Sequence, residues 1–448
     1  MLEKFFKLKE NRTDVKTEVM AGLTTFMAMA YILALNPAIL SASGMDPQAV
    51  LIATALAAFV GTMAMALLAN YPFALAPGLG LNAYFAYTVC GSMGYSWQFA
   101  LFAVFIEGLI FIILSVTNVR EAIFNAIPKQ LKSGVSVGIG LFVAFIGLVN
   151  AGIVSNGATV VALVNFTSDF KTVGIGALLA IIGTIIIAIL HVRKIKGSIL
   201  YGVIATWILG IICEVTGLYK GATLMPSWSD FNIGAIGKTF GQAFSGAAFE
   251  NFNVVSFLVI MVSFLFVDVF DTLGTLIGCA KKADMLDADG KLPRIKPALL
   301  ADAIATSAGA VFGTSTTTTF VESAAGVSVG GRTGLSSVVT GLLFLLSLVL
   351  SPIFIAIPSF ATAPALIFVG FLMLSAVKDI DFSDATESIP AYFAILMMPL
   401  TYSISEGIAF GVISYVLINA CTGKAKKVSP LMYVLAVLFI LKYIFFRT

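Results

Sequence analysis

The sequence predicts an all-α polytopic membrane protein with fourteen transmembrane spans, arranged as two inverted repeats of seven. Three observations support this. Hydrophobic residues make up 59% of the 448 residues and charged residues 11%, with a mean hydropathy of +1.02. Soluble domains carry roughly 25% charged residues, so a soluble fold is excluded. Apolar runs near the bilayer-spanning length recur along the chain, and motifs of the first half return in the second.

Fourteen apolar runs approach the roughly 20 residues that a helix needs to cross the hydrocarbon core. They lie near 19–43, 47–69, 75–91, 98–117, 134–152, 173–190, 197–217, 254–279, 298–312, 316–330, 334–357, 364–377, 388–403 and 405–421. A further apolar stretch at 430–446 contains Lys442, and we expect it to lie in the membrane interface.

The third and tenth runs contain residues that disfavour an intact helix. The third opens with Ala-Pro-Gly-Leu-Gly-Leu-Asn at 76–82, and the tenth with Gly-Thr-Ser-Thr-Thr-Thr-Thr at 313–319. Non-helical backbone at membrane depth occurs only where it is buried in protein or lines a cavity. We therefore predict that spans 3 and 10 are broken, with residues 76–81 and 314–318 extended and meeting near the bilayer centre.

The two halves share motifs in the same order. An offset of 235 residues aligns three pairs, and offsets of 230 and 209 align further motifs later in each half. The three pairs are Gly78 with Gly313, Phe85 with Phe320, and Gly91 with Gly326. Because seven is odd, the second copy must enter the membrane upside down. The expected organisation is a cytoplasmic N-terminus (1–18), a first repeat (19–217), an extracellular connection (218–253), a second repeat (254–421) and a C-terminal apolar tail (422–448).

Charge placement predicts the orientation. Lysines and arginines gather in the loops 118–133, 191–196, 280–297, 378–387 and 422–429, whereas 218–250 holds only Lys220 and Lys238. This is the positive-inside pattern of a multi-pass inner-membrane (cell-membrane) protein with a cytoplasmic N-terminus. The net charge of +3 gives no reason to expect nucleic acid as a partner. Four separated cysteines and the single His191 predict neither a metal site nor a cofactor.

Five ionisable groups lie inside the predicted spans, with no lysine or arginine expected at their depth: Glu107, Asp268, Asp271, Asp302 and Glu322. Such residues are functional candidates, and desolvation favours their neutral, proton-binding form. Asp268 and Asp271 are three residues apart and share a helix face. Glu322 stands beside the broken tenth element. We expect these three to couple transport to protons. Glu107 and Asp302, together with Asn36 before Pro37 at the end of the first helix, are expected to be structural.

The predicted binding site is acidic and aromatic. Asp268 and Glu322 are its acids, and Asn82, Phe85, Thr319 and Phe320 stand beside the broken elements. Anions would be repelled. A flat, neutral, hydrogen-bonding ring such as a purine base suits carboxylate acceptors flanked by aromatic rings. An ionised acid favours the N1–H edge of guanine and hypoxanthine, which we prefer, whereas a protonated acid favours adenine.

Three motifs resemble the nucleobase:cation symporter-2 superfamily, and in particular its AzgA-like purine permeases. They are Phe-Val-Asp-Val-Phe-Asp-Thr-Leu-Gly-Thr-Leu at 266–276, Phe-Val-Glu-Ser-Ala-Ala-Gly at 320–326, and Ala-Pro-Gly-Leu-Gly-Leu-Asn-Ala-Tyr-Phe-Ala-Tyr at 76–87. The resemblance covers roughly 15–425. It implies a core domain of spans 1–4 and 8–11, a gate domain of spans 5–7 and 12–14, and elevator-type proton symport of adenine, guanine or hypoxanthine.

The resemblance also assigns roles to single residues. Asp268, Glu322 and Asn82 match substrate-binding positions of spans 8, 10 and 3. The wider superfamily often has Glu at the first position and Asn directly after the span-ten acid or amide, where this chain has Asp268 and Ser323. These differences favour the purine branch.

Two alternatives remain at the level of sequence. One is an anion exchanger of the same architecture, which should place neutral or basic groups where the acids sit. The other is an intramembrane acid-dependent enzyme, although the Gly-x-Gly-Asp motif of intramembrane aspartyl proteases is absent, and we do not expect an enzyme. The expected partners are a purine base, a proton and the lipid bilayer. Sodium in place of the proton, and assembly as a homodimer, stay open.

Overall fold

The computed structural model describes residues 2–117, 127–156, 161–167, 169–228, 232–250, 252–287 and 292–445. Parts of the expected loops 118–133 and 280–297, and the last residue of 430–446, lie outside these ranges. Within them, eleven helical stretches are long and apolar enough to cross a membrane. They comprise α2 (Val15–Met29) with α3 (Ile32–Leu40), α4 (Pro47–Ala64), α6 (Trp97–Val116), α8 (Lys129–Asn150), α9 (Ile175–Val192), α10 (Ser198–Val215), α11 (Val254–Lys282), α12 (Ile295–Phe312), α14 (Gly334–Leu346) with α15 (Ser351–Ala356), α16 (Ser359–Leu374) and α18 (Ile404–Cys421).

Three of the fourteen predicted spans are not among these eleven. The run at 388–403 corresponds to α17 (Ala385–Leu400), which has 16 residues. The runs at 75–91 and 316–330 each begin as a strand and continue as short helical segments. These are β1 (Leu75–Pro77) followed by α5 (Leu79–Ala83) and a π-helix over Tyr84–Ser92, and β4 (Thr317–Thr319) followed by α13 (Ser323–Ser328).

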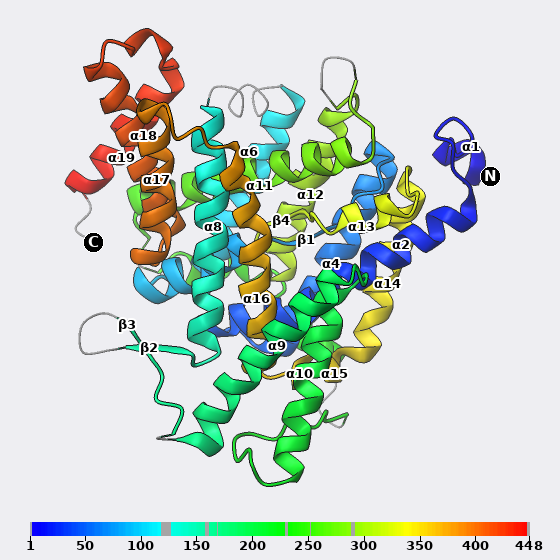
Figure 1. Cartoon of the computed structure of the whole chain (residues 1–448). Helices are drawn as coiled ribbons and strands as arrows, with labels where there is room; N and C mark the ends of the chain where they lie inside the picture. Colours follow the sequence, from blue (N-terminus) through cyan, green and yellow to red (C-terminus); the bar gives the residue numbers. More distant parts are fainter. Residues whose placement is uncertain are drawn as a thin grey trace.

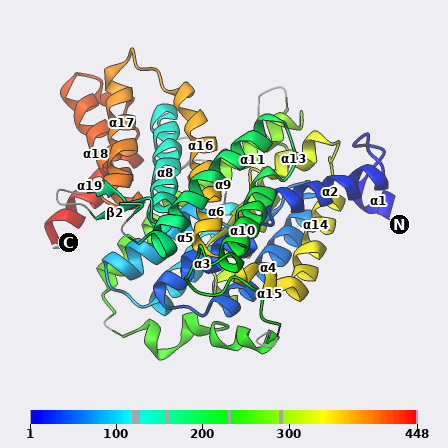
Figure 2. The ribbon, with the colours of Figure 1, turned by 60° about the horizontal axis from the view of Figure 1, so that its bottom comes forward.

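The helices pack as two sets on either side of the strand pair. One set contains α8, α9, α10, α16, α17 and α18, and the other contains α2, α3, α4, α6, α11, α12, α13 and α14. In two views of the ribbon, α8, α17 and α18 lie on one side and α1 (Leu2–Phe6), α2 and α14 on the other (Figures 1 and 2). The strands β1 and β4 lie between the two sets in Figure 1.

The two strands form an antiparallel pair, with Leu75 opposite Thr319 and Ala76 opposite Thr318. The expected non-helical backbone at 314–318 is confirmed. The expectation for 76–81 was too long, because α5 already begins at Leu79, where leucine and alanine favour a helix. The strands are offset by 242 residues (75 to 317). The sequence offset of 235 therefore does not superpose the two broken elements.

The first span is interrupted earlier than predicted. The helix does not end at Asn36-Pro37, because α3 continues through Pro37 to Leu40. The interruption lies at Ala30 and Tyr31, where backbone bonds join residues three apart (Leu33 N to Ala30 O, 3.1 Å). Proline removes one backbone N–H, and here the helix tolerates that loss.

The connection at 218–250 and the C-terminal tail both pack on the helices. Three short 3-10 helices at Ile233–Lys238, Gln242–Phe244 and Gly246–Ala248 contact α4 and α6. The backbone N–H of Gly241 donates to Val311 O at 2.7 Å, which fastens this connection to the end of α12. The tail forms α19 (Pro430–Phe445), which packs on α18, and the Tyr443 hydroxyl donates to Glu406. A further hairpin, β2 (Val154–Asn156) with β3 (Val161–Leu163), follows α8.

Glycines allow a close helix contact in the first set. A Cβ atom added at Gly370 of α16 would lie 2.4 Å from the Gly140 carbonyl oxygen and 2.6 Å from Ala144 Cβ, both on α8. Real Cβ atoms do not approach backbone oxygens that closely, so α8 and α16 would have to separate to accept a side chain.

We predict that Gly370→Ala destabilises the protein by about 1–3 kcal/mol, because overpacking forces the two helices apart. The measurement is the midpoint of thermal unfolding in detergent. Gly237→Ala is the matched control, since nothing lies within 4 Å of the added Cβ atom there. Equal midpoints for the two variants would contradict the packing described for α8 and α16.

Candidate functional site

The threonine run before and within β4 is tied to four different helices. Asn36 Nδ2 of α3 donates to Thr314 Oγ1 at 2.8 Å. Thr316 Oγ1 donates to Glu107 Oε2 of α6 at 2.9 Å. Thr306 Oγ1 of α12 donates to Thr317 O at 3.1 Å. Together with a bond to α11, these contacts hold a completely buried strand and the residues before it. Asn36 and Glu107, expected to be structural, lie in this network.

The bond to α11 centres on one hydroxyl group. Thr272 Oγ1 lies 2.6 Å from Thr318 Oγ1, 2.9 Å from Asp268 Oδ1, and 3.0 and 3.1 Å from the two carboxyl oxygens of Asp302. Both aspartates are fully buried. A threonine hydroxyl has one proton to donate. Two acids share that donor, so this network brings the expected substrate-binding acid Asp268 together with Asp302.

A cavity of about 520 Å³ lies beside the strand pair. Its wall includes Tyr31, Gly78, Lys132, Asp271, Thr319, Phe320, Glu322 and Asp379. Asp271 and Glu322 enter it from α11 and from the turn before α13. At its other end the wall is formed by the first turn of α8, with Lys132, and by the end of α16, with Asp379. This volume lies within the range of small-molecule sites.

The two aspartates of α11 do not share one environment. At roughly 100° per residue, Asp268 and Thr272 lie about 40° apart around the helix, whereas Asp268 and Asp271 lie about 60° apart in the opposite sense. Asp268 therefore points into the threonine network. Asp271 lies on the face of α11 that lines the cavity, together with Gly274, Thr275 and Gly278. A Cβ atom at Gly78 would lie 3.4 Å from Asp271 Oδ2, so the glycine leaves that carboxyl group open.

Glu322 is held by a tyrosine from the first span. The Tyr31 hydroxyl donates to Glu322 Oε1 at 2.5 Å. The tyrosine is 1% exposed and lies at the interruption between α2 and α3. Both residues line the cavity.

The other expected binding residues divide between the cavity and its support. Thr319 and Phe320 line the cavity, and Thr319 Oγ1 is buried without a hydrogen-bond partner among the described residues. Asn82 lies behind the wall, where its Nδ2 donates to Pro77 O at 3.4 Å and its Oδ1 has no described partner. Phe85 is fully buried against Phe264, with ring centroids 6.4 Å apart, and does not reach the cavity.

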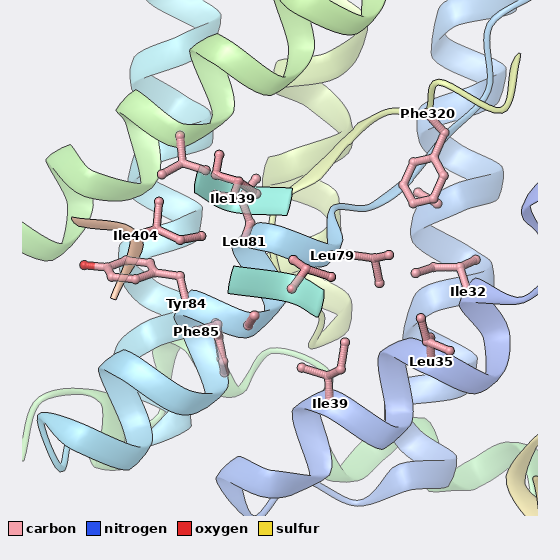
Figure 3. Close-up of a cluster of buried hydrophobic side chains, with 14 of the residues drawn as sticks. Ile32, Leu35, Ile39, Leu79, Leu81, Tyr84, Phe85, Ile139, Phe320 and Ile404 are labelled. Atoms are coloured by element: carbon pink, nitrogen blue, oxygen red, sulfur yellow. The ribbon is translucent and has the colours of Figure 1, made fainter. Parts of the chain in front are cut away.

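Apolar side chains surround α5 where it meets the other helix set. Figure 3 shows Leu79 and Leu81 from α5 with Ile139 from α8 and Ile404 from α18, and Phe320 further along. A Cβ atom at Gly80 would lie 2.7 Å from Ile139 Cγ2. At this point the two helix sets therefore meet closely, through apolar side chains and a glycine without a side chain.

Polar and aromatic contacts lie at the opposite end of the third element. Asn150 Nδ2, at the end of α8, donates to the Tyr87 hydroxyl at 2.9 Å. The Tyr402 ring packs edge-on against Tyr87 and Phe142, at 5.8 and 5.5 Å between centroids. Thr88 Oγ1 donates to the backbone oxygen of Tyr402 at 3.0 Å. These contacts join the two helix sets on the side away from Lys132.

Sequence reasoning missed three residues of the site. Thr272 lies one helical turn after Asp268, and that spacing was the available signal. Tyr31 is 291 residues from Glu322 and shows no pattern in the sequence. Lys132 was counted with a loop, but it lies in the first turn of α8 and lines the same cavity as the acids. Among the described residues, no group of three or more His, Cys, Asp or Glu could hold a metal ion.

Comparison with known proteins identifies the family to which the chain is similar. A family model described as the permease family (Xan_ur_permease) matches residues 16–410. A putative permease of Methanocaldococcus jannaschii, MJ0326, is 49% identical over 99% of this chain and 98% of its own. The adenine permease AdeP of Escherichia coli is 43% identical, covering 99% of this chain and 96% of its own. The guanine/hypoxanthine permease PbuG of Bacillus subtilis is 43% identical over the full length of both chains.

Solved structures show the same fold at low identity. The transmembrane domain of the cyanobacterial bicarbonate transporter BicA matches 88% of this chain and 97% of its own, with a TM-score of 0.64 and 16% identity. The anion transporter SLC26A9 matches 92% of this chain and 67% of its own, with a TM-score of 0.58. Eleven apolar helices and full-length permease relatives make the protein a polytopic membrane transporter, not an enzyme. The chain belongs to the nucleobase:cation symporter-2 family of permeases.

Proposed function

We propose that this protein takes up purine nucleobases by proton symport. The observation that carries the proposal is the convergence of Asp271 and Glu322 on one cavity beside the strand pair, with Phe320 and Tyr31 in its wall. Relatives that match over their full length are named adenine permeases and guanine/hypoxanthine permeases. A neutral, flat base offers N–H donors to the carboxyl groups and a face to the aromatic rings.

The cavity chemistry disfavours an anion exchanger, although the fold is shared with anion carriers. Two acids face the cavity beside the strands, whereas Lys132 lies at its far end. An anion at the strand pair would meet two carboxyl groups, and like charges in a low-dielectric site repel strongly. A neutral base avoids this cost.

The buried acids can bind the proton that the proposal requires. Asp268 and Asp302 share the single Thr272 hydroxyl. Two buried carboxyl groups at such a short separation repel when both are ionised, so the pair favours binding one proton. Asp271 lies one residue before Thr272 and faces the cavity. In this proposal Asp268, Asp271 and Glu322 take part in proton coupling, while Glu322, Thr319 and Phe320 contact the base. Asn82 and Phe85 support the wall.

The arrangement of the two helix sets suits elevator-type transport, in which one set moves relative to the other. The set with α2–α6 and α11–α14, which carries both strands, corresponds to the core domain, and the set with α8–α10 and α16–α18 to the gate domain. The smooth apolar contact around Gly80 suits sliding of one set past the other. Counting the two strand–helix elements and α17 with the eleven long helices gives fourteen spans in the proposed 7+7 arrangement. Thr62 of α4 bonds to Leu75 of β1 as Thr306 of α12 bonds to Thr317 of β4, which supports the repeat.

The cavity reaches the loops that the positive-inside pattern places in the cytoplasm, and the Tyr87–Asn150 contact joins the two helix sets on the other side. We therefore propose a cytoplasmic N-terminus and an inward-facing conformation for this structure.

Asp268→Asn and Glu322→Gln should each reduce purine uptake to background while the protein still reaches the membrane. The first removes an acid that binds the proton, and the second replaces an ionisable carboxyl group that faces the base with an amide that cannot exchange a proton. Uptake of radiolabelled hypoxanthine by cells, with membrane levels measured by immunoblot, tests this. Asp381→Asn, an exposed loop acid with a local bond to Ser383, is the control. Normal uptake by both test variants would remove the site assignment.

Uptake should collapse to background when a protonophore dissipates an inward proton gradient, and should be unchanged when sodium is replaced by choline. The reason is that the acids near the cavity can bind protons. Proteoliposomes with imposed gradients give the measurement. Uptake that requires sodium and ignores the proton gradient would contradict proton symport.

Guanine should inhibit uptake of labelled hypoxanthine about ten- to a hundredfold more strongly than adenine. An ionised carboxylate accepts from the N1–H and amino groups of guanine, whereas adenine presents a bare N1 acceptor to it. An opposed buried hydrogen bond costs on the order of 1–3 kcal/mol. Inhibition constants in the same uptake assay give the comparison. Strong inhibition by adenine and none by guanine would show that the site binds its base with a protonated acid.

A further inference from the structure

We propose that Tyr31 is a positioning residue that sets the choice between purines, by holding Glu322 as a hydrogen-bond acceptor. The inference rests on the proposed function and concerns a residue that does not need to touch the base. Tyr31 comes from the interruption of the first span and Glu322 from the turn after β4, 291 residues later.

A short hydrogen bond joins the two side chains. The Tyr31 hydroxyl donates to Glu322 Oε1 at 2.5 Å. A phenol that donates to a carboxylate forms a charge-assisted bond, which is about twice as strong as a bond between neutral groups. This donor therefore stabilises the ionised, acceptor-only form of Glu322 relative to a site without it.

The helix that follows Glu322 does not supply this stabilisation by itself. Glu322 is the N-cap residue of α13, but its side chain accepts no hydrogen bond from the backbone N–H groups of that helix. The described ion pairs include none to Glu322. Tyr31 is therefore the side-chain donor that the described contacts give to this acid.

An ionised carboxylate has about four acceptor positions, so the Tyr31 donor leaves acceptor capacity for the ligand. Glu322 and Tyr31 both line the cavity, with Thr319 and Phe320 beside them. A base bound there presents its edge to an acceptor, which suits the adjacent N1–H and amino donors of guanine. Without the Tyr31 donor, Glu322 gains a proton more readily and becomes donor and acceptor at once. That pattern suits the bare N1 and the amino group of adenine.

The first test measures binding, so that a variant that no longer transports still gives a result. Purified wild type and Tyr31→Phe are compared by competition of guanine and adenine against labelled hypoxanthine. The affinity ratio of guanine to adenine should fall at least tenfold in Tyr31→Phe, with adenine binding kept or improved. Tyr415→Phe, which removes a buried hydroxyl on α18 away from the cavity, should keep the wild-type ratio.

A double variant separates an effect through Glu322 from a direct contact with the base. Glu322→Gln places a fixed donor and acceptor at this position and should itself lower the ratio. Adding Tyr31→Phe to Glu322→Gln should change nothing more, because the tyrosine then has no acid to hold. A further tenfold fall in the double variant would mean that Tyr31 contacts the base directly, and would overturn the proposal.

The pH dependence provides a readout that a packing defect would not change. Guanine should lose its advantage at low pH in the wild type, and in Tyr31→Phe the same loss should occur at higher pH. Other titratable groups near Glu322 are Asp271 and Cys279 on α11, Lys132 on α8 and Asp379 at the end of α16. They are the same in both proteins, so a difference between the two profiles reports on Tyr31.

The outcomes separate this inference from the proposed function. A wild type that neither binds nor transports any purine would reject the proposed function itself. A wild type that binds purines, with an unchanged ratio in Tyr31→Phe, would reject the role of Tyr31 alone. Loss of all purine binding in Tyr31→Phe would also reject it, because holding an acid ionised is not needed for adenine to bind.

Discussion

The pairing of β1 with β4 is the constraint on which the rest of the structure depends. Extended backbone among membrane-spanning helices leaves N–H and C=O groups that lipid cannot satisfy. Each strand supplies partners to the other, and Thr62, Ser323 and Thr306 bond to backbone groups of the strands or next to them. Two helical elements must therefore be interrupted at the same place, and that interruption brings a turn, the end of a strand and the short helix α5 to the wall of one cavity.

The threonines of β4 link this constraint to the acids. The strand and the residues before it are buried, and the hydroxyl groups of Thr314, Thr316 and Thr318 find partners on α3, α6 and α11. The partners include Glu107 directly, and Asp268 and Asp302 through Thr272. Acids that sit deep in an apolar protein are thus held by the same hydroxyl groups that hold the strand. A change in their protonation would act on the backbone that borders the cavity, which gives a physical route between proton binding and the site.

The position of the cavity follows from the two helix sets. The strands and α11 belong to one set, whereas Lys132 and Ile139 belong to α8 in the other. A ligand between them touches both sets. Hydrogen bonds join the sets at Tyr87 and Asn150 and between Ser263 of α11 and Ser405 of α18, whereas the side chains around α5 are apolar. Apolar contacts have no fixed direction, so they permit sliding where a network of hydrogen bonds would resist it.

The sequence by itself determined the membrane class, the number and order of most apolar helices, and the interruption of the third and tenth elements. Composition and run length report these features directly, because a bilayer needs about 20 apolar residues and glycine, proline and threonine runs disfavour helices. It also identified Asp268, Asp271 and Glu322 as unusual, since acids inside apolar runs are costly. The motifs it quoted for the permease family agree with the full-length relatives.

Only the tertiary structure decided which acids meet and what faces the cavity. A rotation of about 60° around α11 separates Asp268 from Asp271, and such a small angle does not decide burial until the neighbouring helices are in place. Tyr31 reaches Glu322 across 291 residues, and Lys132 reaches the same cavity from α8. The two strands begin 242 residues apart, whereas the sequence motifs are offset by 235. Each of these features depends on the packing of segments distant in the chain, which no local pattern of residues encodes.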